Sequence, residues 1–152
     1  MKTITLQKNQ QFNNRVEISA LLGGDKQKGI ATTKNNTILL FTNDSELYSD
    51  YFYPKGSHDY CLYTGIGRIG HQDSIDNNMY NLNLAVLSHA NRNKTLLVFE
   101  KQKSKICFVG QYVLIETHQN IQPDDNDELR RVFVFHLKKS SDTFEATIEE
   151  TI

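Results

Sequence analysis

The chain has 152 residues, 38% of them hydrophobic and 23% charged, and this size and composition predict one soluble domain that spans residues 1–152. No apolar run approaches the roughly 20 residues needed to cross a bilayer, and the first residues lack the apolar segment of a secretory signal, so we expect a cytoplasmic protein without a membrane partner. The net charge of −1 excludes a chain that is basic throughout, so any surface for an acidic partner has to be local.

The first patterned segment is a short helix before a pair of glycines. Apolar residues at positions 12, 16, 18, 21 and 22 precede Gly23 and Gly24, and glycine is the usual stop of a helix. Residues 37–42 then form an apolar, β-rich run between asparagines, which predicts a buried strand. Residues 51–54 extend a strand, and residues 60–63 form another that enters a glycine-rich loop.

A second helix is the clearest element of the sequence. Between residues 77 and 90, apolar side chains recur at the spacing of one buried helical stripe. Further strands are expected at residues 95–100, 106–109, 111–115 and 132–137. These elements predict an α+β fold in which a curved, mostly antiparallel sheet or partial barrel carries the helices. Residues 1–11 and 139–152 are weakly patterned and are treated as tails that can fray.

The two cysteines, Cys61 and Cys107, indicate reduced thiols. They lie far apart in apolar, strand-like segments, with no CxxC pair and no histidine at zinc-site spacing. No metal or other cofactor is therefore expected.

Motifs of nucleases and of nucleophilic enzymes are incomplete. An HNH site needs a second histidine beside His89, and a PD-(D/E)xK site needs an acidic-x-Lys strand after Asp124; neither is present, and GxSxG is also missing. The chain is therefore not expected to be an enzyme. An enzyme that acts on nucleic acid through His71, His118 and the acidic residues 124–128 is kept as an alternative.

Residues 65–70 (GIGRIG) match the spacing of a dinucleotide-binding GxGxxG loop but not its context. No helix of a βαβ unit is expected to start there, and no acidic residue ends a second strand about 20 residues later. We interpret the segment as a flexible glycine loop beside a ligand.

The residues around this loop suit the capture of a base outside the helical stack. Such a site needs aromatic faces, which Tyr48 and Tyr63 supply, and polar groups aimed at the base edge. Asp50 is the candidate acceptor for the exocyclic amino group of a cytosine. Thr64 offers its hydroxyl or backbone amide, and Gly65 allows the chain to approach the nucleotide closely.

Two loops are candidates for contact with the rest of the nucleic acid. One is a local basic cluster that contains Lys26, Gln27 and Lys28. The other follows the pocket residues and contains Arg68, His71 and Gln72. These side chains are expected to grip the backbone or to fill the hole that a flipped base leaves.

The run YTGIGRIGHQ at residues 63–72, followed by an asparagine-bearing helix start at residues 81–84, resembles the YTGxGxxGDQ…N pattern of SRA (SET- and RING-associated) domains of the PUA superfamily. Residues 15–30 are similar to the entry of these domains, and their later strands resemble residues 97–100, 108–112 and 130–137. The resemblance covers most of the chain. It is nearest to the SRA-like domains of McrA-type restriction endonucleases, which contain an HNH nuclease and depend on DNA modification.

This resemblance implies a PUA-like β-barrel flanked by helices, which binds duplex DNA and flips 5-methylcytosine or 5-hydroxymethylcytosine into a pocket. Carried over by position, the pocket consists of Tyr48, Asp50, Tyr63 and Thr64, with Gly65 beside them. Asp59 competes with Asp50 as the carboxylate that contacts the cytosine.

The sequence departs from the family pattern in two places. His71 stands where the family often has aspartate, and the segment after Gln72 is too short for the long finger loop of eukaryotic members. Insertion into the duplex is therefore expected from residues 25–28 or 68–78.

The predicted function is recognition of duplex DNA with modified cytosine, without catalysis by the chain itself. The implied partners are that DNA and an HNH nuclease, fused to the chain or associated with it. The alternatives are a PUA-like module for another modified base or RNA, and the enzyme described above.

Overall fold

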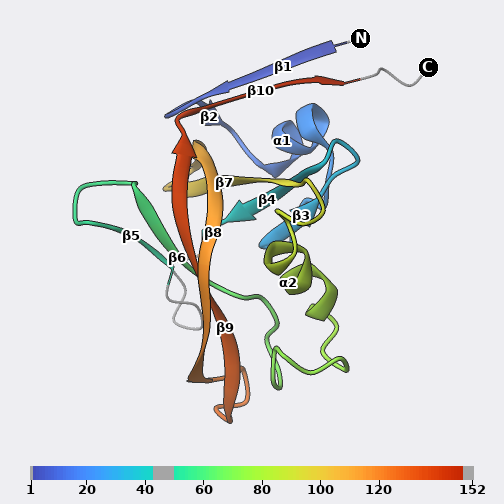
Figure 1. Cartoon of the computed structure of the whole chain (residues 1–152), viewed down its shortest axis with the longest axis vertical. Helices are drawn as coiled ribbons and strands as arrows, with labels where there is room; N and C mark the ends of the chain where they lie inside the picture. Colours follow the sequence, from blue (N-terminus) through green and yellow to red (C-terminus); the bar gives the residue numbers. More distant parts are fainter. Residues whose placement is uncertain (1, 43–49, 149–152) are drawn as a thin grey trace.

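The computed structural model describes residues 2–42 and 50–148, and most of their elements are β-strands (Figure 1). In chain order the elements are β1 (Lys2–Gln7), β2 (Gln11–Phe12), α1 (Arg15–Leu22), β3 (Ile30–Thr32), β4 (Thr37–Phe41), β5 (Tyr51–Tyr53), β6 (Tyr60–Thr64), α2 (Tyr80–Leu87), β7 (Thr95–Gln102), β8 (Lys105–Pro123), β9 (Leu129–Ser141) and β10 (Thr143–Ile148). The predicted α+β class is confirmed.

The main sheet is open. In the described residues its strands follow the order β3-β4-β7-β8-β9-β6-β5, and the short β2 pairs with β8. β4 and β7 run parallel, whereas the other neighbours are antiparallel. Because no pairing joins β3 to β5 among these residues, the prediction of a barrel is corrected to an open, mostly antiparallel sheet.

The centre of this sheet is buried on both faces. All of β4 is buried, and successive residues enter different clusters: Leu40 packs in the cluster of Val86 from α2, whereas Leu39 and Phe41 pack in the cluster of Ile18 from α1. Successive side chains of a strand point to opposite faces. The two clusters therefore place α1 and α2 on opposite faces of the sheet.

The predicted helices are both present, with different boundaries. α1 begins at a cap in which the Asn14 side chain accepts a hydrogen bond from the Glu17 amide, and it ends at Gly23, whose φ of 85° suits glycine. α2 is shorter than the predicted 77–90, because Asn77 Oδ1 accepts from the Met79 amide in a turn that precedes the helix.

The hairpin of β8 and β9 is longer than predicted. The strands have 19 and 13 residues, but the sequence predicted only their apolar parts. The added residues 116–123 are mostly exposed, so hydrophobic alternation does not reveal them. At the far end of this hairpin (Figure 1), the Asp125 amide donates to the Arg68 carbonyl at 2.9 Å, which joins the hairpin tip to the glycine loop.

The two ends of the chain pair with each other. β1 and β10 are antiparallel, and Ile4, Leu6 and Phe144 are buried in the same cluster as α1. The prediction of frayed tails is therefore wrong for residues 2–11 and 139–148. Each strand has its partner at the opposite end of the sequence, where local patterns give no sign of the pairing.

Cys61 and Cys107 are buried free thiols, as predicted. Burial raises the pKa of both thiols, so neither is activated as a nucleophile near neutral pH. Within the part of the chain that the structure describes, none of the helices is long and apolar enough to cross a membrane.

Candidate functional site

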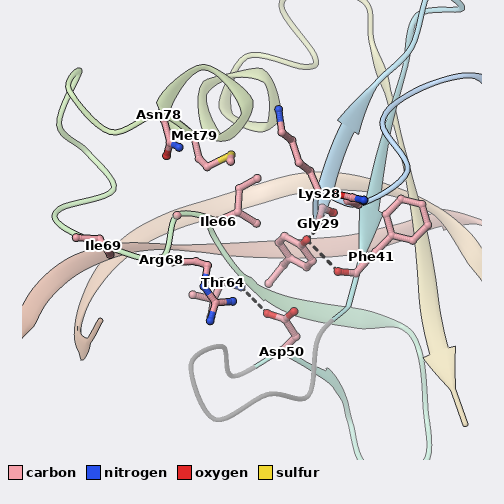
Figure 2. Close-up of a pocket in the computed structure, with 13 residues that line it drawn as sticks. Lys28, Gly29, Phe41, Asp50, Thr64, Ile66, Arg68, Ile69, Asn78 and Met79 are labelled. Carbon is pink, nitrogen blue, oxygen red and sulfur yellow. Dashed lines mark hydrogen bonds between the residues drawn. The ribbon is translucent and has the colours of Figure 1, made fainter. Parts of the chain in front are cut away.

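A cavity of about 480 Å³ opens at the carboxyl end of β6, where the chain leaves the sheet for the glycine loop (Figure 2). Its walls come from segments far apart in sequence: residues 27–29, Phe41 at the end of β4, residues 63–64 and 66–69, and residues 78–79 before α2. Asp50, which directly precedes β5, completes the lining. The cavity therefore forms only when strands, loops and a helix have assembled.

This cavity brings together part of the predicted site. The predicted residues that line it are Gln27, Lys28, Asp50, Tyr63, Thr64 and Arg68. The described residues that were predicted but do not line it are Lys26, Gly65, His71 and Gln72. Tyr48 lies outside the described residues. An apolar wall that the sequence did not reveal is formed by Phe41, Ile66, Ile69 and Met79.

Tyr63 is fixed by its hydroxyl group. Its Oη atom donates towards the carbonyl oxygens of Gly29 and Phe41, at 2.8 and 3.0 Å. Gly29 allows this approach, since a Cβ atom there would lie 3.0 Å from Tyr63 Oη and 3.1 Å from Ile66 Cγ2. Because Tyr63 is 1% exposed, its ring belongs to the inner wall of the cavity.

Among the described residues that line the cavity, Asp50 supplies the carboxylate. Its Oδ1 accepts a hydrogen bond from the backbone amide of Thr64 at 2.8 Å, and the side chain is half-buried (Figure 2). Asp59, the competing candidate, is exposed and lies in a separate depression with Lys138. The structure thus places Asp50, and not Asp59, beside Tyr63 and Thr64.

Two buried amide side chains hold the glycine loop. Gln72 Nε2 donates to the Gly65 carbonyl at 2.6 Å, and its Oε1 accepts from the Phe133 amide at 2.9 Å. Asn83 bonds in the same way to the backbone of Ile66. A Cβ atom on Gly65 would lie 2.6 Å from Gln72 Oε1 and 2.9 Å from Asn83 Oδ1. Glycine at this position is therefore required by the packing under the loop.

Gln72 has a different role from the predicted one. Its side chain is 0% exposed, so in this conformation it cannot contact a nucleic acid, and the prediction of a DNA contact is corrected to a loop-holding role. Asn83 has the same role, which the sequence did not reveal. The sequence did indicate an asparagine-bearing helix start after the glycine loop. It did not indicate which atoms the asparagine contacts.

Arg68 and Ile69 lie on the rim of the cavity. The Arg68 side chain is 68% exposed, and Ile69 is 60% exposed. Arg68 donates to both carboxylate oxygens of Asp125 in the hairpin tip, at 2.6 and 3.1 Å. Asp124 accepts from the Gly70 amide at 3.1 Å, and this bond, together with bonds from amides of its own turn, holds the pKa of its carboxyl below the usual range. The hairpin tip and the glycine loop therefore form one unit.

The loop of residues 25–28 is fixed by its own aspartate and by Arg15. Asp25 Oδ1 accepts from the amides of Gln27 and Lys28 at 2.7 and 2.8 Å, which lowers the pKa of Asp25. Arg15 Nη2 donates to the carbonyls of Asp25 and Lys28, and its guanidinium lies 3.5 Å from the centroid of the Phe41 ring. This fixed loop presents the exposed side chains of Lys26, Gln27 and Lys28.

The histidines and the acidic turn do not converge on a metal or catalytic centre. His71 Nδ1 accepts from the Arg131 amide at 3.0 Å, His118 lies against His136, and Asp124 accepts backbone amides. In the described parts of the chain, no group of three or more His, Cys, Asp or Glu residues is placed to hold a metal ion. This geometry gives the enzyme hypothesis no support.

Solved structures define the class of the domain. The chain resembles the sulfur binding domain and SRA domain of ScoMcrA, complexed with phosphorothioated DNA, with a TM-score of 0.68 and 22% identity over 87% of this chain and 39% of that one. It resembles the SUVH5 SRA domain in complex with methylated CHH DNA with a TM-score of 0.62 and 20% identity over 88% of each chain. For the DNA modification-dependent restriction endonuclease AspBHI, the TM-score is 0.70 and the identity 11%, over 93% of this chain and 79% of that one. The fold is thus that of an SRA domain.

The sequence identifies the family more closely. Residues 8–151 match the family model described as ScoMcrA-like, SRA domain, and the chain belongs to this family. The resemblance inferred from the YTGIGRIGHQ run is confirmed. The chain spans less than half of the ScoMcrA chain that it matches. No curated protein matches it.

Proposed function

We propose that this chain binds duplex DNA that carries a modified cytosine, 5-methylcytosine or 5-hydroxymethylcytosine, and holds the flipped base in the cavity beside Asp50 and Tyr63. Membership of the ScoMcrA-like SRA family supports this function. Further support comes from SUVH5 SRA domains, which were solved with methylated and with hydroxymethylated DNA.

The observation that favours cytosine is the carboxylate of Asp50, fixed by the Thr64 amide in a partly apolar cavity. A carboxylate accepts from the exocyclic N4 amino group of cytosine, and such contacts discriminate between bases by about 1–3 kcal/mol. Phe41, Ile66 and Met79 line the same cavity. Contact of their apolar surface with a methyl group on the base is more favourable than contact with water.

Aromatic stacking is proposed to hold the base in place. Tyr63 lies in the cavity wall, and the family pattern assigns the second aromatic face to Tyr48. Stacking on an aromatic side chain contributes about 1–3 kcal/mol per base. Thr64 acts through the amide that holds Asp50, and Gly65 acts by admitting the amide side chains that fix the loop.

The loops of residues 25–28 and 68–78 are proposed to face the duplex. Lys26, Lys28 and Arg68 supply positive charge beside the cavity, which a chain with a net charge of −1 needs locally. Ile69 is an exposed apolar side chain on the rim, suited to enter the space that the flipped base leaves. His71 lies on the same loop and is exposed.

Recognition without catalysis is the proposed activity, with DNA cleavage left to an HNH nuclease that is fused to or associated with the chain. The ScoMcrA chain, of which the match covers 39%, has room for such additional domains. AspBHI shows that this fold occurs in a DNA modification-dependent restriction endonuclease.

Fluorescence anisotropy with matched duplexes tests this function. The duplexes share one sequence and contain cytosine, 5-methylcytosine, 5-hydroxymethylcytosine, N6-methyladenine or a phosphorothioate. We expect the tightest binding to a duplex with modified cytosine, and equal affinity for all of them contradicts the proposal. Tighter binding to a single-stranded RNA of the same sequence would instead favour an RNA-reading PUA-like module, and metal-dependent cleavage of labelled DNA would favour the enzyme.

A further inference from the structure

We propose that a strip of aromatic rings, on the face of the sheet opposite α2, is a second binding surface. This strip stacks unpaired bases of single-stranded nucleic acid. The strip consists of Tyr51, Tyr53, Tyr60, His136 and His118, which come from β5, β6, β9 and β8. None of these side chains lines the cavity beside Tyr63. The strip and the cavity are therefore distinct surfaces.

The rings follow one another across neighbouring strands. The centroids of Tyr51 and Tyr53 are 6.1 Å apart, and Tyr53 stacks on Tyr60 at 5.1 Å with 12° between the ring planes. Tyr53 Oη lies 3.4 Å from His136 Nδ1, and the rings of His136 and His118 are 4.4 Å apart. A continuous run of ring surface thus extends from the edge strand β5 to β8.

The alternation of side chains turns this run away from the core. Phe52, between Tyr51 and Tyr53, packs against the core cluster that includes α2, and Cys61 of β6 belongs to the same cluster. The tyrosines next to them therefore point to the other face. His136 is turned outward in the same way, since both of its neighbours in β9 are buried in that cluster. In Figure 1, β5 and β6 project to the side, away from both helices.

Sheet packing does not account for the whole strip. Cross-strand aromatic pairs stabilise a sheet, which explains the Tyr53–Tyr60 stack. It does not explain Tyr51, which lies on the edge strand and is 52% exposed, or His118, which is exposed at the other end. Each end of the strip therefore offers ring surface to a planar ligand.

The charges beside the strip favour a ligand held mainly by stacking. Lys138 pairs with Tyr60 across β9 and β6, and both Lys138 and Lys55 are exposed. Glu116, opposite His136, offsets part of this positive charge. Single-strand binding combines positive charge along the backbone with stacking of the bases on aromatic side chains, and this stacking accepts any base. Asp50 of the cavity directly precedes Tyr51, so nucleic acid held at the cavity is the nearest source of unpaired bases.

Anisotropy with a labelled oligothymidylate of about 12 nucleotides, within the usual site sizes for single strands, tests the strip. We expect the wild-type chain to bind it, Tyr51→Ala to weaken binding by about tenfold, and Tyr51→Phe to restore it, because phenylalanine keeps the ring. Tyr80→Ala is the matched control, since Tyr80 belongs to α2, which packs on the face of the sheet opposite the strip. The chain has no tryptophan, so quenching of tyrosine fluorescence gives a second readout.

The oligothymidylate contains no cytosine, so this result is independent of the modified-cytosine function. No binding by the wild-type chain overturns the proposal, and so does equal binding by wild type and Tyr51→Ala when both melt at the same temperature. Self-association that is lost in Tyr51→Ala, without binding of the oligonucleotide, would also overturn it and assign the strip to a second copy of the chain.

Discussion

Asn83 of α2 and Ile66 of the glycine loop exchange two hydrogen bonds. Asn83 Oδ1 accepts from the Ile66 amide at 2.9 Å, and Asn83 Nδ2 donates to the Ile66 carbonyl at 2.8 Å. The asparagine is fully buried. Its side-chain amide pairs with the backbone N–H and C=O of Ile66, as a neighbouring strand would. A single side chain thus fixes the helix to the wall of the cavity.

Asn83→Ala is expected to destabilise the domain and to weaken DNA binding. The substitution leaves the Ile66 amide and carbonyl without their partner, and each buried group left unpaired costs about 1–3 kcal/mol. Urea unfolding followed by circular dichroism measures the loss. Asn81→Ala, on the exposed side of the same helix, is the control and should change stability by less than about 0.5 kcal/mol. Equal losses in the two variants would show that Asn83 does not hold the loop.

Asp50→Ala is expected to remove the preference for duplexes with modified cytosine. The carboxylate is the group proposed to accept from the base, and such a contact is worth about 1–3 kcal/mol. Anisotropy with the matched duplexes measures the preference. Asp59→Ala is the control, because Asp59 is exposed and lies in a different depression. Loss of preference in Asp59→Ala alone would mean that the wrong carboxylate has been assigned.

Elements with a local pattern could be predicted from the sequence, and elements paired over long distances could not. The continuous apolar run that contains Ile38, Leu39 and Leu40 identifies a strand buried on both faces. The pairing of β1 with β10 has no local sign, because each strand is short and half polar. The same holds for residues 116–123, whose exposed side chains belong to a strand held by backbone hydrogen bonds to β9.

The site shows a similar division. Sequence indicated the residue types of the pocket, and Asp50, Tyr63 and Thr64 do meet at one cavity. It did not distinguish side chains that face a ligand from those that hold the loop, and Gln72 proved to be buried. That distinction depends on what packs beneath the loop, which in this domain is α2 and β9.

Asp125→Asn is expected to strengthen DNA binding. Asp125 pairs with Arg68 on the rim, and removing its charge leaves the arginine more available to phosphate.

Arg68→Ala should weaken binding to all duplexes and reduce the slope of log affinity against log salt by about 1. Titrations at several salt concentrations measure both effects. Asp142→Asn is the control, since it also breaks an exposed ion pair, with Lys139, but away from the cavity. Equal gains in the two aspartate variants would indicate a general effect of net charge.

The unfolding free energy is expected to fall when the pH drops below about 6.5, because of His136. Burial lowers the pKa of His136, the nearby His118 lowers it further, and Glu116 acts in the opposite direction. The folded state therefore binds this proton less readily than the unfolded chain, whose histidines titrate near pH 6.5. By linkage, the contribution of neutral His136 is complete above about pH 6.5 and is lost as the pH falls through the lower pKa of the folded state.

Thermal melting between about pH 8 and pH 5 measures this effect, since the interval covers the ordinary range of histidine titration. His136→Gln should flatten the curve, because glutamine keeps hydrogen-bonding groups without the titration. Aspartates whose pKa is lowered, such as Asp25, Asp73 and Asp124, lose their contributions only at more acid pH, below about 4. A loss of stability between pH 6.5 and 5 that persists unchanged in His136→Gln would therefore assign the effect to another group.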